Sequence, residues 1–330
     1  MLKVTFQDVL KAAVRLKGRI NETPLVYSDI LSEETGAEVH IKMEALQKTG
    51  SFKIRGALNK IDMLTVEEQQ KGVVTASAGN HAQAVAYASS LKGISAKIVV
   101  PTPTPQTKLD GIKRYGGELI IHGDQYDDAE IYALQLAEET GGTFINAFED
   151  DDVIAGQGTA GLEAFLKVPD IDILLVPSGG GGLLCGVALV AKAINPKIRV
   201  IGIQTYASPP WYHAFKAGEL VDVEYLPSYA EGLHGGIAQG NFDLAQGIVD
   251  DFVLVEEEDV AKAVYWMAKH HHYMLEGSAV VGITALQKGL IENIKGKKIV
   301  TFATGGNVDL ARISQFYETF EGGDKTQWIQ

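Results

Sequence analysis

Residues 171–186 read IDILLVPSGGGGLLCG, and this stretch decides how the chain folds. The apolar run over residues 171–176 predicts a buried strand, and the run from Leu183 to Ile194 predicts a helix. Between them lie four successive glycines, Gly179, Gly180, Gly181 and Gly182. Glycines lose much backbone entropy on folding, so such a loop indicates close backbone approach or unusual dihedral angles. Free N–H groups at a helix N-terminus commonly bind phosphate, which favours an anion site over a merely flexible turn.

Short apolar segments alternate with helical patterns along the rest of the chain. Further strands are expected over residues 38–43, 73–74, 96–100, 118–121, 143–145, 200–203, 253–255 and 299–302. Helices are expected over residues 6–17, 51–59 with Ser51 as the cap, 81–91, 127–140, 158–166, 260–273 and 279–289. Short buried strands separated by helices predict an α/β fold of mostly parallel sheets flanked by helices. The 330 residues favour two domains, a larger one of residues 1–66 and 151–330 and a smaller, mobile one of residues 67–150.

The charge and cysteine content restrict the class of protein. Lys and Arg number 29 and Asp and Glu 42, a net charge of −13, which disfavours nucleic acid as a partner. No apolar run approaches the roughly 18 residues of a membrane span, so no membrane partner is expected. The N-terminus lacks the unbroken apolar region of a secretory signal. The single Cys185 allows no intrachain disulfide and no cysteine-based zinc site, so we expect a cytoplasmic protein.

A second glycine pattern, GQGTAG at residues 156–161, fits the dinucleotide motif GxGxxG. A dinucleotide site needs a strand before the motif and an acidic residue about 20 residues later. Only the short segment 153–155 precedes it, after the acidic run 149–152. We therefore interpret the motif as a helix start and the acidic run as a solvated turn whose charge suits the neighbouring helix N-termini. The tetraglycine loop also lacks the lysine of an ATP-binding loop, so NAD and ATP are both disfavoured.

The segment SFKIRG at residues 51–56 places Lys53 between two apolar residues at the start of a helix. Its side chain could simply cover apolar surface. A lysine in an apolar pocket instead loses its preference for the charged form and becomes a nucleophile. A lysine imine together with a phosphate anchor is the minimal requirement for pyridoxal phosphate.

Five segments together resemble the serine/threonine dehydratase family of pyridoxal-phosphate enzymes, which has the tryptophan-synthase β-subunit fold. They are SFKIRGA (51–57), SAGNHAQAVA (77–86), VIAGQGT (153–159), PSGGGGLL (177–184) and TGGNVD (304–309). The resemblance covers about residues 5–315. It implies pyridoxal 5'-phosphate in the cleft between the two domains, held mainly by the larger one.

The resemblance implies a role for each motif. Lys53 would form the Schiff base with the cofactor and carry the proton at the substrate α-carbon, while Phe52 packs on the ring. Asn80 would bind the 3-hydroxyl of the ring, and Thr304 would lie beside the pyridine nitrogen, where the family usually has serine. The phosphate would be bound by Gly179, Gly180, Gly181, Gly182 and Leu183. The substrate carboxylate would be bound by the catalytic residue Ser77 together with Ala78, Gly79, Asn80 and His81.

The implied activity is a lyase reaction, in which a dehydratase (ammonia-lyase) of amino-acid metabolism removes water and then ammonia. The substrate would be a 2-amino-3-hydroxy acid such as threonine or serine, and the product a 2-oxo acid. A hydroxyl at Thr304 does not force the pyridine nitrogen to be protonated, which favours elimination. Related racemases have a second hydroxyl at the position of Ala78, and a methyl group cannot transfer a proton. Racemisation, β-replacement and simple ligand binding remain the alternatives.

Several residues depart from the pattern of relatives or stay open. Some relatives bind a cation through a carboxylate where this chain has Gln204, so no metal is expected. Glu276 would be a structural group near the cofactor. Three groups of residues have no settled role. Trp211, Tyr212 and His213 would line the substrate mouth or form a subunit contact, and His234 would contact the substrate or fill a turn. His270, His271 and His272 are expected at a solvated helix end. We expect a homodimer or higher homo-oligomer without control by a separate C-terminal domain.

Overall fold

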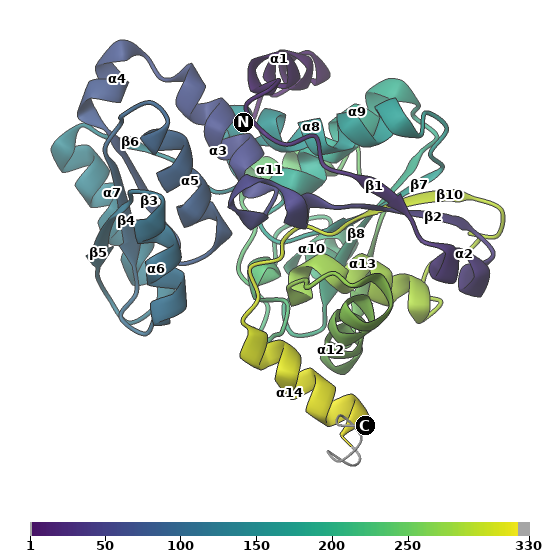
Figure 1. The fold of residues 1–330 in the computed structure, drawn as a ribbon. Helices are drawn as coiled ribbons and strands as arrows, with labels where there is room; N and C mark the ends of the chain where they lie inside the picture. Colours follow the sequence, from purple (N-terminus) through teal and green to yellow (C-terminus); the bar gives the residue numbers. More distant parts are fainter. Residues whose placement is uncertain (1, 323–330) are drawn as a thin grey trace.

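The computed structural model of the protein describes residues 2–322 and contains two sheets (Figure 1). The larger sheet has six strands in the order β1-β2-β10-β7-β8-β9, and β1 alone is antiparallel to its neighbour. Its strands are β1 (Leu25–Tyr27), β2 (Glu38–Lys42), β7 (Ile173–Pro177), β8 (Arg199–Thr205), β9 (Asp251–Val255) and β10 (Lys298–Phe302).

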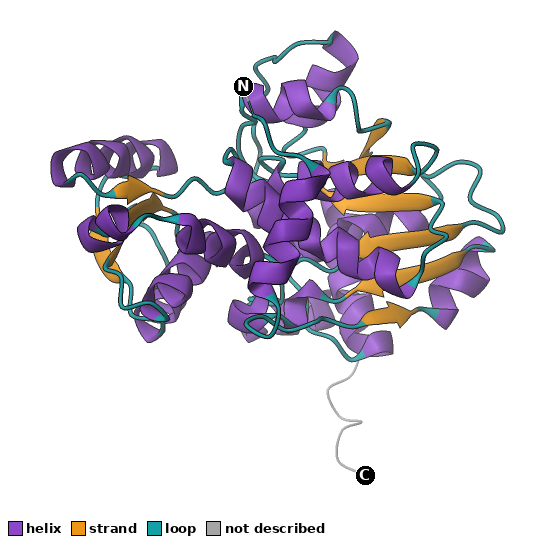
Figure 2. Cartoon of the chain, turned by 90° about the horizontal axis from the view of Figure 1, so that it is seen from above, coloured by secondary structure: helices purple, strands orange, loops and turns teal. Residues whose placement is uncertain are grey.

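The smaller sheet has four parallel strands in the order β5-β4-β3-β6. They are β3 (Val73–Ala76), β4 (Ala96–Val100), β5 (Glu118–Ile121) and β6 (Thr143–Phe144). Figure 2 shows the two groups of strands separated by helices. The α/β fold with mostly parallel sheets is therefore confirmed, while the domain limits at residues 66/67 and 150/151 stay a prediction.

Helices flank both sheets. They are α1 (Phe6–Leu16), α2 (Asp29–Thr35), α3 (Lys53–Met63), α4 (Val66–Lys71), α5 (Asn80–Ser90), α6 (Gln106–Arg114), α7 (Tyr126–Thr140), α8 (Asp151–Lys167), α9 (Gly182–Ile194), α10 (Pro210–Ala217), α11 (Gln239–Ala245), α12 (Glu257–Trp266), α13 (Gly277–Gln287) and α14 (Leu310–Glu321). The sequence patterns did not predict α2, α4, α10, α11 and α14. None of the helices within residues 2–322 has the length and apolar character to cross a membrane.

Strand β7 is apolar at every position because both of its faces are buried. Leu174 and Val176 pack into the core on one face of the larger sheet, and Ile173 and Leu175 pack into the core on the other. Successive side chains of a strand point to opposite faces, so a strand covered by helices on both sides must be apolar throughout.

Two predicted helix starts are wrong. Helix α3 begins at Lys53 without a serine cap, because Ser51 forms a β-bridge with Gly305. Helix α8 begins at Asp151, seven residues before the predicted start, because the Asp150 carboxylate accepts hydrogen bonds from the N–H groups of Asp152 and Val153 at 2.9 and 3.0 Å. The acidic run is thus a cap and first helical turn, where carboxylates are favoured.

The GQGTAG motif lies inside α8 and serves helix packing. A Cβ atom at Gly156 would come within 2.4 Å of the Arg55 carbonyl oxygen on α3. One at Gly158 would come within 2.8 Å of the Gly186 carbonyl oxygen on α9. These glycines therefore allow three helices to touch backbone to backbone, which explains the motif without a nucleotide.

A buried group of four charges anchors the start of α3. The Arg55 guanidinium donates to both oxygens of Glu44, at 2.7 and 2.9 Å, and to both oxygens of Glu163, at 2.7 and 2.8 Å. The Lys42 amine donates to Glu163 at 2.5 Å. Two cations thus balance two carboxylates, and Arg55, Glu44 and Lys42 are all 0% exposed.

We expect Arg55→Met to lower the free energy of unfolding by about 3–5 kcal/mol, because it leaves a buried carboxylate uncompensated. Urea denaturation followed by circular dichroism measures this. Lys71→Met is the control, because Lys71 pairs with exposed Glu67 on the surface and should change little. A loss of less than about 1 kcal/mol in Arg55→Met would contradict the assigned importance of the four charges.

Candidate active site

Lys53 is the first residue of α3, and backbone pairing sets its position. The Phe52 N–H donates to the Thr304 carbonyl at 3.1 Å, and Ser51 bridges to Gly305. The turn before it includes Thr49 and Gly50 in the left-handed region, with φ of 64° and 72°. Two predicted motifs about 250 residues apart in the sequence therefore lie side by side.

The Lys53 amine lies in surroundings that weaken its charge. Its Nζ donates to the Ala147 carbonyl at 3.1 Å and lies 5.3 Å from the centroid of the Phe52 ring. Burial lowers the pKa of Lys53 to about 8, and the negative charge of Glu276 partly opposes this. An amine with such a pKa is substantially neutral near pH 8 and can attack an aldehyde.

Asn80, at the start of α5, forms hydrogen bonds with two side chains near the larger sheet, those of Glu276 and Asn307. Its Nδ2 donates to both Glu276 oxygens, at 2.9 and 3.1 Å, and its Oδ1 accepts from Asn307 Nδ2 at 2.7 Å. Burial raises the pKa of Glu276. A Cβ atom at Gly305 would come within 2.5 Å of a Glu276 oxygen, so any other residue there would displace the carboxylate that holds Asn80.

The turn at residues 77–81 leads into the N-terminus of α5. The Gly79 N–H donates to Ser77 Oγ at 3.2 Å, and the space beside Gly79 is open. The His81 ring instead is buried and contacts the Ile145 carbonyl at 3.1 Å. Burial lowers the pKa of His81 to about 3, so the ring is neutral at physiological pH. Only the backbone N–H of His81 therefore suits the carboxylate role predicted for this turn.

The tetraglycine loop runs from β7 into α9 as the sequence predicts. Within residues 2–322, the backbone N–H groups of Gly179, Gly180 and Gly181 have no hydrogen-bond acceptor. A Cβ atom at Gly180 would come within 2.3 Å of the Phe148 ring. Gly181 has φ +99°, and a Cβ atom there would come within 2.5 Å of Trp211. The loop therefore needs glycine, and its unpartnered donors fit an anion such as phosphate.

Residues 147 and 148 connect the amine with the loop. The Ala147 carbonyl accepts the hydrogen bond from Lys53, and the next residue, Phe148, packs against Gly180 and Gly182. A nucleophilic amine therefore lies near a set of free N–H donors. Such a site suits a small aldehyde with an anionic group.

Trp211 and the histidines that the sequence left open lie in surroundings of several kinds. Both expectations for Trp211 are wrong, because it is 0% exposed and stacks on Phe252 with ring centroids 5.4 Å apart. His213 and His234 are exposed. His271 contacts Ser28 Oγ at 3.2 Å, and His272 ends the π-helical turn Met267–His271. Sequence reasoning gave no role to Asn241, which no motif marks, and none to Asn307, although it lies in the TGGNVD motif.

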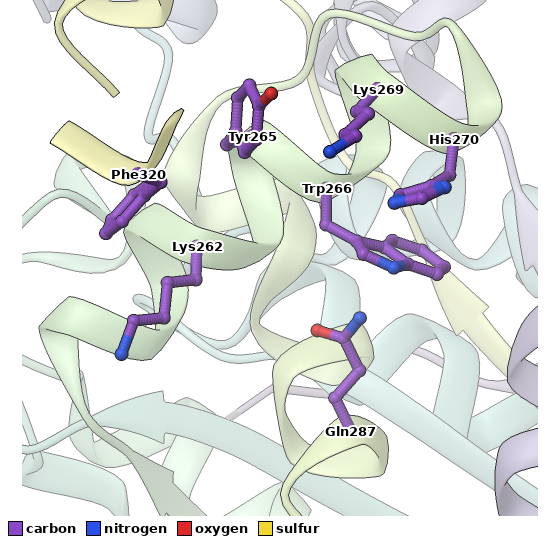
Figure 3. A pocket seen from close by; sticks show the side chains of 7 residues that line it. All are labelled: Lys262, Tyr265, Trp266, Lys269, His270, Gln287 and Phe320. Carbon is purple, nitrogen blue, oxygen red and sulfur yellow. The ribbon is translucent and has the colours of Figure 1, made fainter. Parts of the chain in front are cut away.

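A separate hollow of about 380 Å³ lies at α12, the following π-helical turn and α14 (Figure 3). It is lined by Lys262, Tyr265, Trp266, Lys269, His270, Gln287 and Phe320. None of these residues belongs to the predicted site. Among residues 2–322, no group of three or more His, Cys, Asp or Glu side chains is placed to hold a metal ion.

The chain belongs to the family described as pyridoxal-phosphate dependent enzymes, which it matches over residues 16–305. It is 42% identical to the L-threonine ammonia-lyase of Thermotoga maritima, over 94% of this chain and 78% of that protein. It is 38% identical to the catabolic L-threonine dehydratase of Escherichia coli K12, over 95% and 96% of the two chains. The structure of maize serine racemase has 34% identity and a TM-score of 0.91, and covers 97% of this chain and 98% of its own. The cofactor is therefore pyridoxal 5'-phosphate, as the resemblance implies.

Proposed function

We propose that this pyridoxal-phosphate-dependent lyase acts on L-threonine and L-serine, with Lys53 as its central catalytic residue. The observation that carries the proposal is the half-buried Lys53 side chain, with its pKa near 8, close to the unpartnered N–H groups of the glycine loop. The two relatives that are named for L-threonine support threonine as the preferred substrate.

Each part of the site has a task in this proposal. When bound, the cofactor supplies an electron-withdrawing ring that stabilises the charge developing at the substrate α-carbon. Lys53 holds the cofactor covalently and moves the proton at the α-carbon. The loop from Gly179 to Leu183 holds the phosphate. The turn from Ser77 to His81 holds the substrate carboxylate at the N-terminus of α5.

The ring is oriented by three further residues in this proposal. Phe52 packs on it, Asn80 binds its 3-hydroxyl, and the Thr304 hydroxyl lies beside its nitrogen. Asn80 is already oriented by hydrogen bonds to Glu276 and Asn307, which supports this role. A side chain held on both sides loses less rotational freedom on binding.

Racemisation is the second candidate, because the maize serine racemase has nearly the same fold. Ala78 argues against it. Inversion needs an acid or base on each face of the α-carbon, and a methyl group cannot supply the second one.

A substrate panel separates the two reactions. We expect ammonia and 2-oxo acid in equal amounts from L-threonine and L-serine, and less from 3-hydroxyaspartate and aryl-serines. Chiral chromatography of serine in deuterated buffer reports inversion and exchange of the α-hydrogen in the same sample. Rapid conversion of L-serine to D-serine would favour the racemase instead.

The pH dependence of Lys53 tests the site before any turnover. We expect the rate at which the apoprotein amine reacts with pyridoxal to rise about tenfold per pH unit and to level off above about pH 8. Absorbance of the product measures the rate. Glu276→Gln removes the charge that raises the Lys53 pKa, so the plateau should begin at lower pH. A rate that still climbs at pH 10 would show an ordinary lysine.

We also propose a cytoplasmic homo-oligomer. Leu10, Val14 and Leu166 leave apolar surface on the neighbouring helices α1 and α8, with 40%, 78% and 75% of each residue exposed. Such a surface suits burial against a second copy. Sedimentation equilibrium tests this, and a monomer at micromolar concentration would refute it. Cys185 is a free, buried cysteine, and the absence of a disulfide among the described residues is compatible with a reducing compartment.

A further inference from the structure

The carbonyl oxygens of residues 178–181, which lead into and form most of the glycine loop, all accept hydrogen bonds from residues outside this segment. The Ser178 carbonyl accepts from Gln204 Nε2 at 3.0 Å. The Gly179 carbonyl accepts from Trp211 Nε1 at 2.5 Å, and the Gly180 carbonyl accepts from Asn241 Nδ2 at 2.6 Å. The Gly181 carbonyl accepts from the Cys185 N–H at 2.8 Å, in the first turn of α9. The carbonyls of residues 178–181 are thus occupied, while the N–H groups of the first three glycines have no acceptor among residues 2–322.

The three side-chain donors come from different parts of the larger sheet's surroundings. Gln204 lies on β8, Trp211 at the start of α10, and Asn241 on α11. All three are 0% exposed. No short sequence motif could link them, because they are 26, 32 and 61 residues from the carbonyls that they bind.

Each donor is itself held in place. Gln204 Oε1 accepts from the Tyr212 N–H at 3.1 Å. The Trp211 ring stacks on Phe252 with an interplanar angle of 8°. Asn241 Nδ2 also donates to the Phe148 carbonyl at 3.0 Å. The donors therefore cannot rotate away without breaking further contacts in the core.

Glycine peptides need such support because they rotate easily. A residue without Cβ populates both signs of φ, so a glycine loop can turn a peptide unit and present its carbonyl instead of its N–H. A carbonyl oxygen facing a phosphate would repel it. Binding every carbonyl on the outer side keeps the N–H groups available, which is the advantage of donors that are oriented before the ligand arrives.

We propose that Gln204, Trp211 and Asn241 are positioning residues that fix the peptide planes of the glycine loop for phosphate recognition. They act through the loop rather than by touching the cofactor. The proposal rests on the proposed role of the loop as the phosphate site. It also gives Gln204 a task that needs no cation, because its neutral amide joins β8, the loop and α10.

The test compares two ligands that differ only in the phosphate. Apoprotein is titrated with pyridoxal 5'-phosphate and with pyridoxal, and absorbance and tryptophan fluorescence give the two dissociation constants. Gln204→Met removes the amide with little change in volume, and Trp211→Phe removes the Nε1 donor but keeps an aromatic ring. Trp266→Phe is the control, because Trp266 lies in the separate surface hollow (Figure 3).

We expect each of the two variants to weaken binding of pyridoxal 5'-phosphate by about tenfold, the value of one good hydrogen bond, with pyridoxal binding unchanged within about twofold. Inorganic phosphate should also compete less well in the variants. The Trp266→Phe protein should behave as the unmodified protein does. Asn241→Ser provides a third variant if Trp211→Phe does not fold.

The outcomes distinguish the positioning role of the three side chains from the role of the loop as the phosphate site. Equal weakening of both ligands, or no weakening of either, would overturn the positioning role. An unmodified protein that binds pyridoxal as tightly as pyridoxal 5'-phosphate would instead show that the loop is not the phosphate site. Failure of all three variants to fold would make the residues structural, which also overturns the proposal.

Discussion

Replacing Lys53 with alanine is expected to reduce ammonia release from L-threonine and L-serine at least about 10⁴-fold, because proton transfer by a positioned side chain alone contributes about 10²–10⁴-fold. The variant should also lose the visible absorbance of the covalently bound cofactor. Alanine is the best helix former, so α3 should still begin at this position. Coupled detection of the 2-oxo acid and an absorbance spectrum of the purified protein measure both effects.

Lys53→Arg is the matched control for charge. Arginine keeps the cation near Glu276 but stays protonated, so it cannot attack an aldehyde. We expect it to be as inactive as Lys53→Ala. Substantial turnover in either variant would require another residue to hold the cofactor and would end the present account of the site.

Replacing Gly180 with alanine is the second large effect that we expect. The new methyl group would lie 2.3 Å from the Phe148 ring, so either the ring or the loop must move. Overpacking of this kind costs about 1–3 kcal/mol, which corresponds to about 5–150-fold weaker binding of pyridoxal 5'-phosphate if the loop gives way. Titration of the apoprotein measures the change.

A second substitution identifies the cause. Phe148→Leu in the Gly180→Ala background makes room for the methyl group and should restore part of the lost affinity. Gly247→Ala is the control, because nothing lies within 4 Å of a Cβ atom there and its φ is ordinary. Equal losses in Gly180→Ala and Gly247→Ala would show that the contact with Phe148 is unimportant.

Local patterns were enough for most strands and for the main site motifs. The apolar run of β7 and the glycines after it predict a strand, a loop and a helix without any knowledge of distant residues. Lys53 was predicted as the cofactor lysine because it lies between two apolar residues in a chain that also has a phosphate-type loop, and because its segment resembles that of a known family. The acidic run at residues 149–152 was predicted only in part. Its charge does suit a helix N-terminus, but the run forms the cap and first turn of α8, and its residue types suit a solvated turn equally well.

The residues that hold the site together follow from the three-dimensional arrangement alone. Trp211 carries no local sign that its indole N–H binds the Gly179 carbonyl, and Asn307 none that it orients Asn80.

By itself, the sequence determined the α/β architecture, because hydrophobic periodicity acts over a few neighbouring residues. Its motifs also indicated the cofactor, through their resemblance to a known family, and singled out Lys53 as the residue proposed to hold it. Only the tertiary structure decided the charge of Lys53, the partners of Asn80 and the orientation of the loop carbonyls. Desolvation and hydrogen-bond direction depend on atoms contributed by several distant elements, and no local pattern encodes where those atoms meet.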